Sequence, residues 1–276
     1  MATDPLTPTR VYKPFTFFLL TFLITWVSWF TSAFLSFNAE NQVFYILAML
    51  PGLVAPFAIA LWLIYSSKHR FLRKGFKEKL FNLRLIKPSM LPAIFLLMPA
   101  LVVISIAIST LFGQSWNQLR FSEGFSFSAG SIPVLLILFL AASFEELGWR
   151  SYAMDSINER LNYFKSTIIF GILWAFWHLP LFFIKDYYQY QLLQTNVLFA
   201  INFMVSILPL AFIISWVCRT NSGSITAAIL FHFLINISQE ALQMTQITKC
   251  IETFVLILVA AAIVIWKKEM FFSRKD

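Results

Sequence analysis

The stretch SIPVLLILFLAASFEELGWRSYAM, residues 131–154, decides the fold. It is long and apolar enough to cross a bilayer, because about 20 apolar residues suffice. Yet it carries Glu145, Glu146 and Arg150. Ionised side chains at membrane depth cost roughly 3 kcal/mol or more, so they usually face a protein interior or a water-filled cavity. The stretch therefore predicts a spanning helix that contributes charged residues to a functional site inside a bundle.

The composition extends this prediction to the whole chain. Of its 276 residues, 59% are hydrophobic and 12% are charged, whereas soluble domains average about 45–50% and about 25%. Such a composition is typical of a polytopic membrane protein. Lys and Arg in cytosolic loops explain the net charge of +8 better than nucleic-acid binding does. We therefore expect no nucleic-acid partner.

Eight runs of sequence are candidates for membrane spans. They are residues 15–37, 43–65, 91–112, 131–154, 166–184, 196–217, 223–243 and 251–266. Bilayers admit only helices and closed barrels, and these runs are too continuously apolar for barrel strands. We predict an all-α transmembrane bundle of about eight spans, forming a single integral membrane domain over residues 1–276.

The basic residues indicate how the bundle is oriented. With a cytosolic N-terminus, the predicted inner segments hold 17 Lys and Arg residues, and the outer loops hold only Arg120, Lys185 and Lys249. The positive-inside rule then places both termini in the cytosol. The membrane would be the plasma membrane of a prokaryote or the endoplasmic reticulum of a eukaryote.

Residues 67–88 form the longest basic segment, and they mix Lys and Arg with Phe and Leu. This pattern predicts an interfacial amphipathic helix that contacts anionic membrane lipid. A solvated linker is the alternative.

Two later spans each contain one histidine, His178 and His232. Counted at about 1.5 Å per residue from the predicted inner ends, Glu145, His178 and His232 lie roughly 14–18 Å deep. Three polar residues from three helices would thus reach one layer. This agreement predicts a shared site that is reached from the cytosolic side or through the bilayer.

Helical spacing separates the roles of the two carboxylates. Glu146 and Arg150 are four residues apart, so they lie on one face and can pair. Glu145 points about 100° away from Glu146 and stays free to act on water. His178 can hold that water against Glu145, which would make a general-base pair.

His232 and Asn236 are also four residues apart, so both can donate to one developing oxyanion. A buried histidine bonded to backbone, and an asparagine that packs two helices together, are the structural alternatives. The aromatic residues around the motifs are most simply packing, although some could wall the site: Trp149, Trp174, Phe176 and Trp177.

Three motifs resemble the CAAX prenyl endopeptidase and bacteriocin-processing family, of the Ras-converting-enzyme type. FEELGWR, residues 144–150, matches the EExxxR motif, and HFLIN, residues 232–236, matches HxxxN. WAFWH, residues 174–178, matches FxxxH except that Trp174 replaces the Phe. We expect that replacement to affect only local packing. The resemblance covers residues 131–243, which we take as the catalytic core.

The resemblance implies an intramembrane endopeptidase that cuts after the lipidated cysteine of a prenylated CAAX protein and releases three residues. It also implies three pairs of site residues: Glu145 and His178 would activate water, His232 and Asn236 would stabilise the oxyanion, and Glu146 and Arg150 would support the site. The family includes members linked to bacteriocin processing and immunity, so another substrate stays open.

Other functions stay open as well. A zinc protease would use Glu145, His178 and His232 as ligands, but HExxH is absent and Asn236 is a poor zinc ligand. We expect no cofactor, with zinc as the alternative. A proton-coupled transporter also uses buried Glu, His and Arg, but it would usually show internal repeats or broken helices. A non-catalytic immunity or scaffold protein is a further alternative.

Overall fold

The structure, a computed structural model, describes residues 11–38, 42–122, 128–129, 132–185 and 187–273. Ser131, the first residue of the predicted catalytic core, lies outside these ranges, as do the terminal residues of the predicted domain. The described chain is almost entirely helical. Its helices are α1 (Pro14–Ser36), α2 (Gln42–Ser66), α3 (Arg70–Phe81), α4 (Leu91–Thr110), α5 (Val134–Gly148), α6 (Met154–Asn158), α7 (Tyr163–Trp177), α8 (Tyr188–Thr195), α9 (Val197–Thr220), α10 (Ile225–Glu240), α11 (Gln246–Trp266) and α12 (Lys268–Phe272).

The prediction of an all-α membrane bundle is confirmed. Among the described residues, six segments are long and apolar enough to cross a membrane: Pro14–Ser36, Val43–Ser66, Pro88–Thr110, Tyr163–Phe183, Val197–Thr220 and Gln246–Trp266. The other two predicted spans correspond to α5, which continues through a π-helical turn at Trp149–Ala153 into α6, and to the shorter apolar helix α10. A short antiparallel pair, β1 (Ser128–Ala129) with β2 (Ile132–Pro133), precedes α5. The number of spans that cross stays a prediction.

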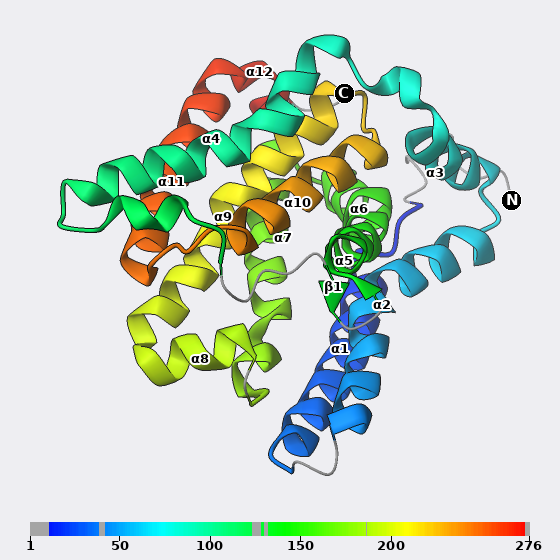
Figure 1. Cartoon of the computed structure of the whole chain (residues 1–276). Helices are drawn as coiled ribbons and strands as arrows, with labels where there is room; N and C mark the ends of the chain where they lie inside the picture. Colours follow the sequence, from blue (N-terminus) through cyan, green and yellow to red (C-terminus); the bar gives the residue numbers. More distant parts are fainter. Residues whose placement is uncertain (1–10, 39–41, 123–127, 130–131, 186, 274–276) are drawn as a thin grey trace, which may run out of the picture.

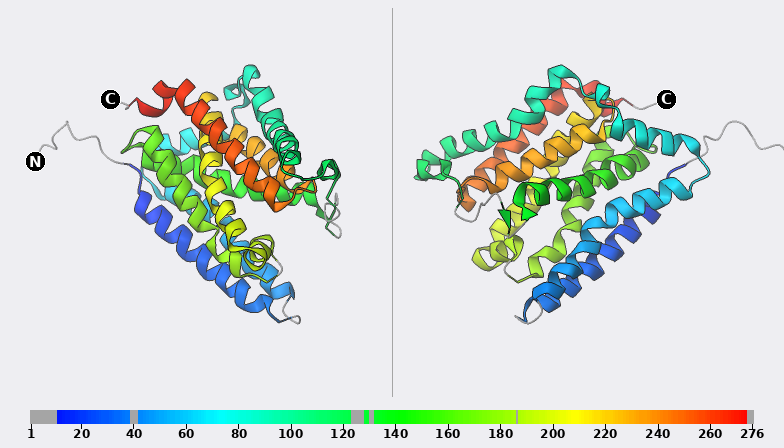
Figure 2. Two further views of the ribbon diagram at one scale, coloured as in Figure 1. Left: turned by 90° about the vertical axis from the view of Figure 1, so that its left-hand side faces the viewer. Right: turned by 45° about the vertical axis from the view of Figure 1, so that its right-hand side comes forward.

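The helices are arranged so that α5 and α7 lie between two outer groups (Figures 1 and 2). An antiparallel pair, α1 and α2, forms one side, and α2 packs on α5. On the other side α10 packs on α5, while α4 contacts both α10 and α11. Helix α9 packs against both α7 and α11. This arrangement surrounds the charged stretch of α5 with protein.

The amphipathic helix predicted over residues 67–88 is shorter in the structure. Helix α3 covers Arg70–Phe81 and buries Leu72 and Phe76 against the bundle. It ends at Asn82, whose backbone is extended and whose side chain caps the next turn by accepting from the Arg84 amide. Lys79 of α3 forms an ion pair with Asp155 of α6. Helix α3 is therefore attached to the bundle, and its contact with lipid stays a prediction.

Gly148 allows α5 and α2 to approach closely. A Cβ atom at this position would lie 2.4 Å from the carbonyl carbon of Pro56 in α2. Real Cβ atoms do not come that close to backbone, so any larger residue would push the two helices apart. Gly148 also directly precedes the π-helical turn, a feature that is frequent at functional sites.

We predict that Gly148→Ala lowers the stability of the detergent-solubilised protein by about 1–3 kcal/mol, the usual cost of overpacking a core. The measurement is the thermal unfolding midpoint. Gly75→Ala is the matched control, because a Cβ there meets nothing within 4 Å and alanine is the better helix former by about 0.5–1 kcal/mol. A wild-type midpoint for Gly148→Ala would contradict the close approach.

Candidate active site

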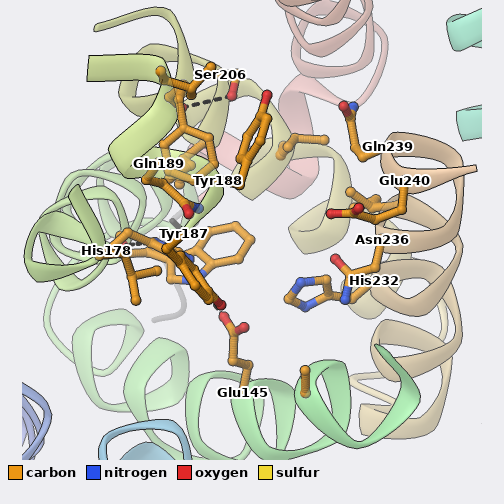
Figure 3. A pocket seen from close by; sticks show the side chains of 18 of the residues that line it. Glu145, His178, Tyr187, Tyr188, Gln189, Ser206, His232, Asn236, Gln239 and Glu240 are labelled. Atoms are coloured by element: carbon orange, nitrogen blue, oxygen red, sulfur yellow. Dashed lines mark hydrogen bonds between the residues drawn. The ribbon is translucent and has the colours of Figure 1, made fainter. Parts of the chain in front are cut away.

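A cavity of about 380 Å³ contains the predicted reacting residues. Glu145, His178, His232 and Asn236 all line it. Figure 3 shows Glu145 rising from α5, with His232 and Asn236 of α10 on one side and His178 on the other. The common layer that was predicted from depth along the helices is therefore the wall of one cavity.

Glu146 and Arg150 form the buried ion pair that their spacing predicts. The Nε of Arg150 donates to Glu146 Oε2 at 2.7 Å, and both side chains are almost fully buried. Nη1 of Arg150 donates to Ser215 Oγ of α9 at 3.0 Å, and the guanidinium lies 4.7 Å from the centre of the Phe170 ring. The other carboxylate oxygen, Oε1, lies 2.9 Å from Nδ1 of His232 in α10. Glu146 thus connects α5 with α10 directly, and with α9 through Arg150.

These contacts fix which nitrogen of each histidine faces the cavity. Glu146 is paired with a guanidinium and is therefore a carboxylate, so Nδ1 of His232 carries a hydrogen and donates to it. Nδ1 of His178 lies 2.8 Å from the Trp174 carbonyl oxygen, which can only accept, so this nitrogen also carries a hydrogen. In both rings Nε2 is left for a group in the cavity. The outer hydrogen bonds therefore orient both imidazoles.

Glu145 is held differently from Glu146. No Lys or Arg in the described part of the chain forms an ion pair with it. Its Oε2 accepts from Nε1 of Trp174 at 2.8 Å and from Nε1 of Trp149 at a longer 3.4 Å. Indole donors hold the carboxylate in place without neutralising its charge. Its second oxygen, Oε1, accepts no hydrogen bond from the residues that the structure describes and is left for a ligand.

The expectation that Trp174 affects only local packing is therefore wrong. The family motif has Phe at this position, and phenylalanine has no donor. Trp174 in α7 supplies the shorter of the two hydrogen bonds to Glu145 in α5. The expectation failed because the contact depends on how these two helices cross, which spacing along one helix does not reveal.

Asn236 is only weakly engaged by the protein. Its Nδ2 lies 3.4 Å from the carbonyl oxygen of Leu138 in α5, a long hydrogen bond. The carboxamide lines the cavity one helical turn beyond His232. It can therefore turn toward a group that binds between α5 and α10.

Tyr187 is a cavity residue that the sequence motifs did not indicate. It lies in the segment between α7 and α8, and Figure 3 shows its phenol pointing toward Glu145. Although 37% of its surface is exposed, burial by the surrounding protein raises the pKa of Tyr187 to about 12, and the Glu240 and Glu145 carboxylates add to the effect. The hydroxyl therefore keeps its proton at neutral pH and can donate a hydrogen bond.

The cavity also extends beyond the predicted core of residues 131–243. Helices α1 and α2 contribute apolar side chains, and the first half of α11 contributes polar ones: Trp29, Met49, Leu50, Leu53, Gln246, Lys249 and Glu252. One wall of the cavity is thus apolar, and its far end is polar.

The cavity extends from the candidate site toward one end of the bundle. Beyond the candidate site, its lining residues come mainly from the second half of α1, the first halves of α2, α5, α9 and α11, the end of α7, α8, and the last turns of α10. The positive-inside count places those helix ends outside the cytosol, whereas the prediction of cytosolic access requires the opposite. The two predictions cannot both hold for an opening at these helix ends. Orientation and side of access stay predictions.

The residues suggested as zinc ligands do not make a ligand cluster in the described ranges. There, no three His, Cys, Asp or Glu side chains gather closely enough to hold a metal ion. Glu145 is held by indoles, and His232 donates to Glu146.

We predict that Glu146→Ala lowers the free energy of unfolding by about 3–5 kcal/mol, because it leaves Arg150 buried without its partner. The measurement is chemical or thermal unfolding in detergent. Glu145→Ala is the control. Its free energy of unfolding should fall by less than about 2 kcal/mol, since the substitution removes only hydrogen bonds from indoles. The opposite order of stabilities would show that the two carboxylates have been assigned the wrong roles.

Comparison with known proteins identifies the family. Residues 127–238, which include all three motifs, match the model of the type II CAAX prenyl endopeptidase Rce1-like family. A protein of Methanococcus maripaludis named CAAX prenyl protease 2 is 52% identical over 263 residues, which cover 95% of this chain and 97% of that relative. The similarity therefore includes the helices that precede the motifs. The resemblance seen in the motifs is confirmed: this chain is a peptidase that belongs to the Rce1-like type II CAAX prenyl endopeptidase family.

Proposed function

We propose that the protein hydrolyses the peptide bond after the prenylated cysteine of a CAAX protein and releases the C-terminal tripeptide, with no metal ion. The observation that carries this proposal is the unequal setting of the two adjacent carboxylates. Glu146 has both oxygens occupied by Arg150 and His232. Glu145 has one oxygen held by indoles and the other left for a ligand in the cavity. The name of the archaeal relative supports the substrate class.

In the first step, water binds between Oε1 of Glu145 and Nε2 of His178. Glu145 takes a proton from this water while the water oxygen attacks the carbonyl carbon of the cysteine residue. His178 orients the water through the Nε2 lone pair. The carbonyl π electrons move to oxygen and give a tetrahedral oxyanion. When the C–N bond breaks, protonated Glu145 returns its proton to the leaving nitrogen. The carboxylate is then regenerated.

His232 and Asn236 stabilise the oxyanion. Because Nδ1 of His232 donates to Glu146, Nε2 can donate as well only if the ring is an imidazolium. The imidazolium form also balances charge, because the Glu145 and Glu146 carboxylates would then be matched by two cations, Arg150 and His232. Asn236 supplies an amide donor one helical turn away. A cation and a dipole fixed in a cavity of low dielectric stabilise developing charge strongly.

The apolar wall suits the prenyl chain. Met49, Leu50 and Leu53 of α2 face the cavity together with Ile137 and Leu138 of α5. Leu50 and Ile137 are exposed as well as lining the cavity, which would suit an apolar wall that continues to the lipid-facing surface. A prenylated substrate already anchored in the membrane can approach sideways between these helices. The archaeal relative favours the plasma membrane of a prokaryote.

The direct test is to incubate the purified protein with a farnesylated CAAX peptide and to detect the tripeptide by mass spectrometry. We expect release by the wild type with or without a chelator, and no release by Glu145→Gln, which keeps the shape of the side chain but cannot take a proton. Loss of activity with chelator, restored by zinc, would establish the metallo-protease alternative. A chain that leaves every prenylated peptide intact would contradict the proposed function.

We predict that Trp174→Phe lowers kcat about tenfold with little change in KM. Losing one hydrogen bond to a charged group costs roughly 1.5 kcal/mol, which corresponds to about tenfold in rate. Trp216→Phe is the matched control, because Trp216 is buried in α9 away from the cavity, and its kcat should stay within about twofold. A Trp174→Phe enzyme with unchanged kcat would show that the indole does not position Glu145.

A further inference from the structure

The far end of the cavity carries a lysine that the reaction scheme does not use. Lys249 lies in the first turn of α11 and is the only Lys or Arg among the described residues that line the cavity. The sequence placed it in an outer loop, as one of three basic residues on that side. In the structure it is half-buried and faces the same space as Glu145.

Lys249 is held in position without being neutralised by an ion pair. Its Nζ lies 4.6 Å from the centre of the Tyr188 ring and 3.4 Å from the backbone carbonyl oxygen of Gln239. No carboxylate in the described part of the chain forms an ion pair with it. Two acidic residues line the same cavity: Glu252, three residues later on α11, and Glu240 of α10. The Glu252 carboxylate instead accepts from Nε2 of Gln239 at 2.6 Å.

The distance from the reacting residues to Lys249 corresponds to a tripeptide. His232 and Gln239 are seven residues apart on α10, which is about 10.5 Å at 1.5 Å per residue. Nζ of Lys249 contacts the Gln239 carbonyl at the end of that path. Three extended residues span about 10–11 Å. A chain whose scissile carbonyl lies at His232 would therefore bring a carboxylate three residues later to Lys249.

We propose that Lys249 binds the free C-terminal carboxylate of the substrate and thereby sets the cut three residues from the chain end. This proposal rests on the proposed function and adds the element that measures the length of the leaving peptide. A charge-assisted hydrogen bond in a partly buried site is stronger than a neutral one. The Tyr188 ring holds the ammonium group through a cation–π contact. The polar side chains around it, Gln239 and Gln246 among them, can bond the backbone of the tripeptide.

Lys249 can also be explained as a structural partner of Glu252, three residues later on α11. That explanation predicts a loss of stability when Lys249 is replaced, but no dependence on the chemistry of the substrate's end. The two explanations therefore differ in how the enzyme treats a peptide whose terminal charge has been removed.

The test compares a farnesylated CAAX peptide that has a free C-terminal carboxylate with the same peptide as its C-terminal amide. We expect the wild type to prefer the acid at least tenfold in kcat/KM. Lys249→Met should bring the acid down to the level of the amide, mainly by raising KM, and leave the amide unchanged. Lys185→Met is the control, because this exposed lysine of the same predicted side does not line the cavity and should keep the preference.

Equal cleavage of acid and amide by the wild type, or a preference that survives in Lys249→Met, would overturn the proposal and leave the endopeptidase activity standing. Failure to cleave either peptide would overturn the proposed function together with it. A second measurement needs no variant. The free tripeptide should inhibit the wild type at least tenfold more strongly than its C-terminal amide, and equal inhibition would contradict the role of Lys249.

Discussion

The buried ion pair between Glu146 and Arg150 is the constraint on which the rest of the site depends. A carboxylate and a guanidinium that are removed from water lose several kcal/mol of hydration each, so most of their remaining hydrogen bonds must be satisfied inside the protein. His232 and Ser215 supply two of those bonds from α10 and α9, whereas Nη2 of Arg150 is buried without a partner among the described residues. The pair thereby fixes two helices, α9 and α10, against α5 and orients the His232 ring toward the cavity. It also leaves Glu145, one residue earlier, as the carboxylate with an oxygen to spare.

The different environments of Glu145 and Glu146 could be predicted from the sequence, because they follow from positions on one helix. The i, i+4 spacing gives the Glu146–Arg150 pair, and counting residues along three spans brings Glu145, His178 and His232 to one layer, as the cavity confirms. Contacts between helices could not be predicted in this way. The Trp174 indole reaches Glu145 only because of how α7 crosses α5, and Lys249 faces the cavity only because α11 begins beside the end of α10. The length of α3 also depended on a local cap at Asn82.

The cavity has an apolar wall and a polar end, and this asymmetry matches an amphiphilic substrate. A prenyl chain is most stable when it stays out of water, in lipid or against the apolar surfaces of α2 and α5. A tripeptide with a terminal charge instead needs hydrogen-bond donors and a cation. The residues that we propose to react lie where these two environments meet. The scissile bond would thus be placed by both of its neighbours, the lipid on one side and the carboxylate on the other. Proximity of this kind accounts for a large part of enzymatic rate enhancement.

We propose that Glu145 activates water and does not itself attack the substrate. A single turnover in water labelled with oxygen-18, with enzyme in excess over a farnesylated peptide, tests this directly. We expect one labelled oxygen in the new carboxylate of the prenylated fragment and no label in the enzyme peptide that contains Glu145. An unlabelled fragment, with the label in the Glu145 carboxylate, would reveal an acyl-enzyme intermediate and contradict the role of Glu145 as a general base.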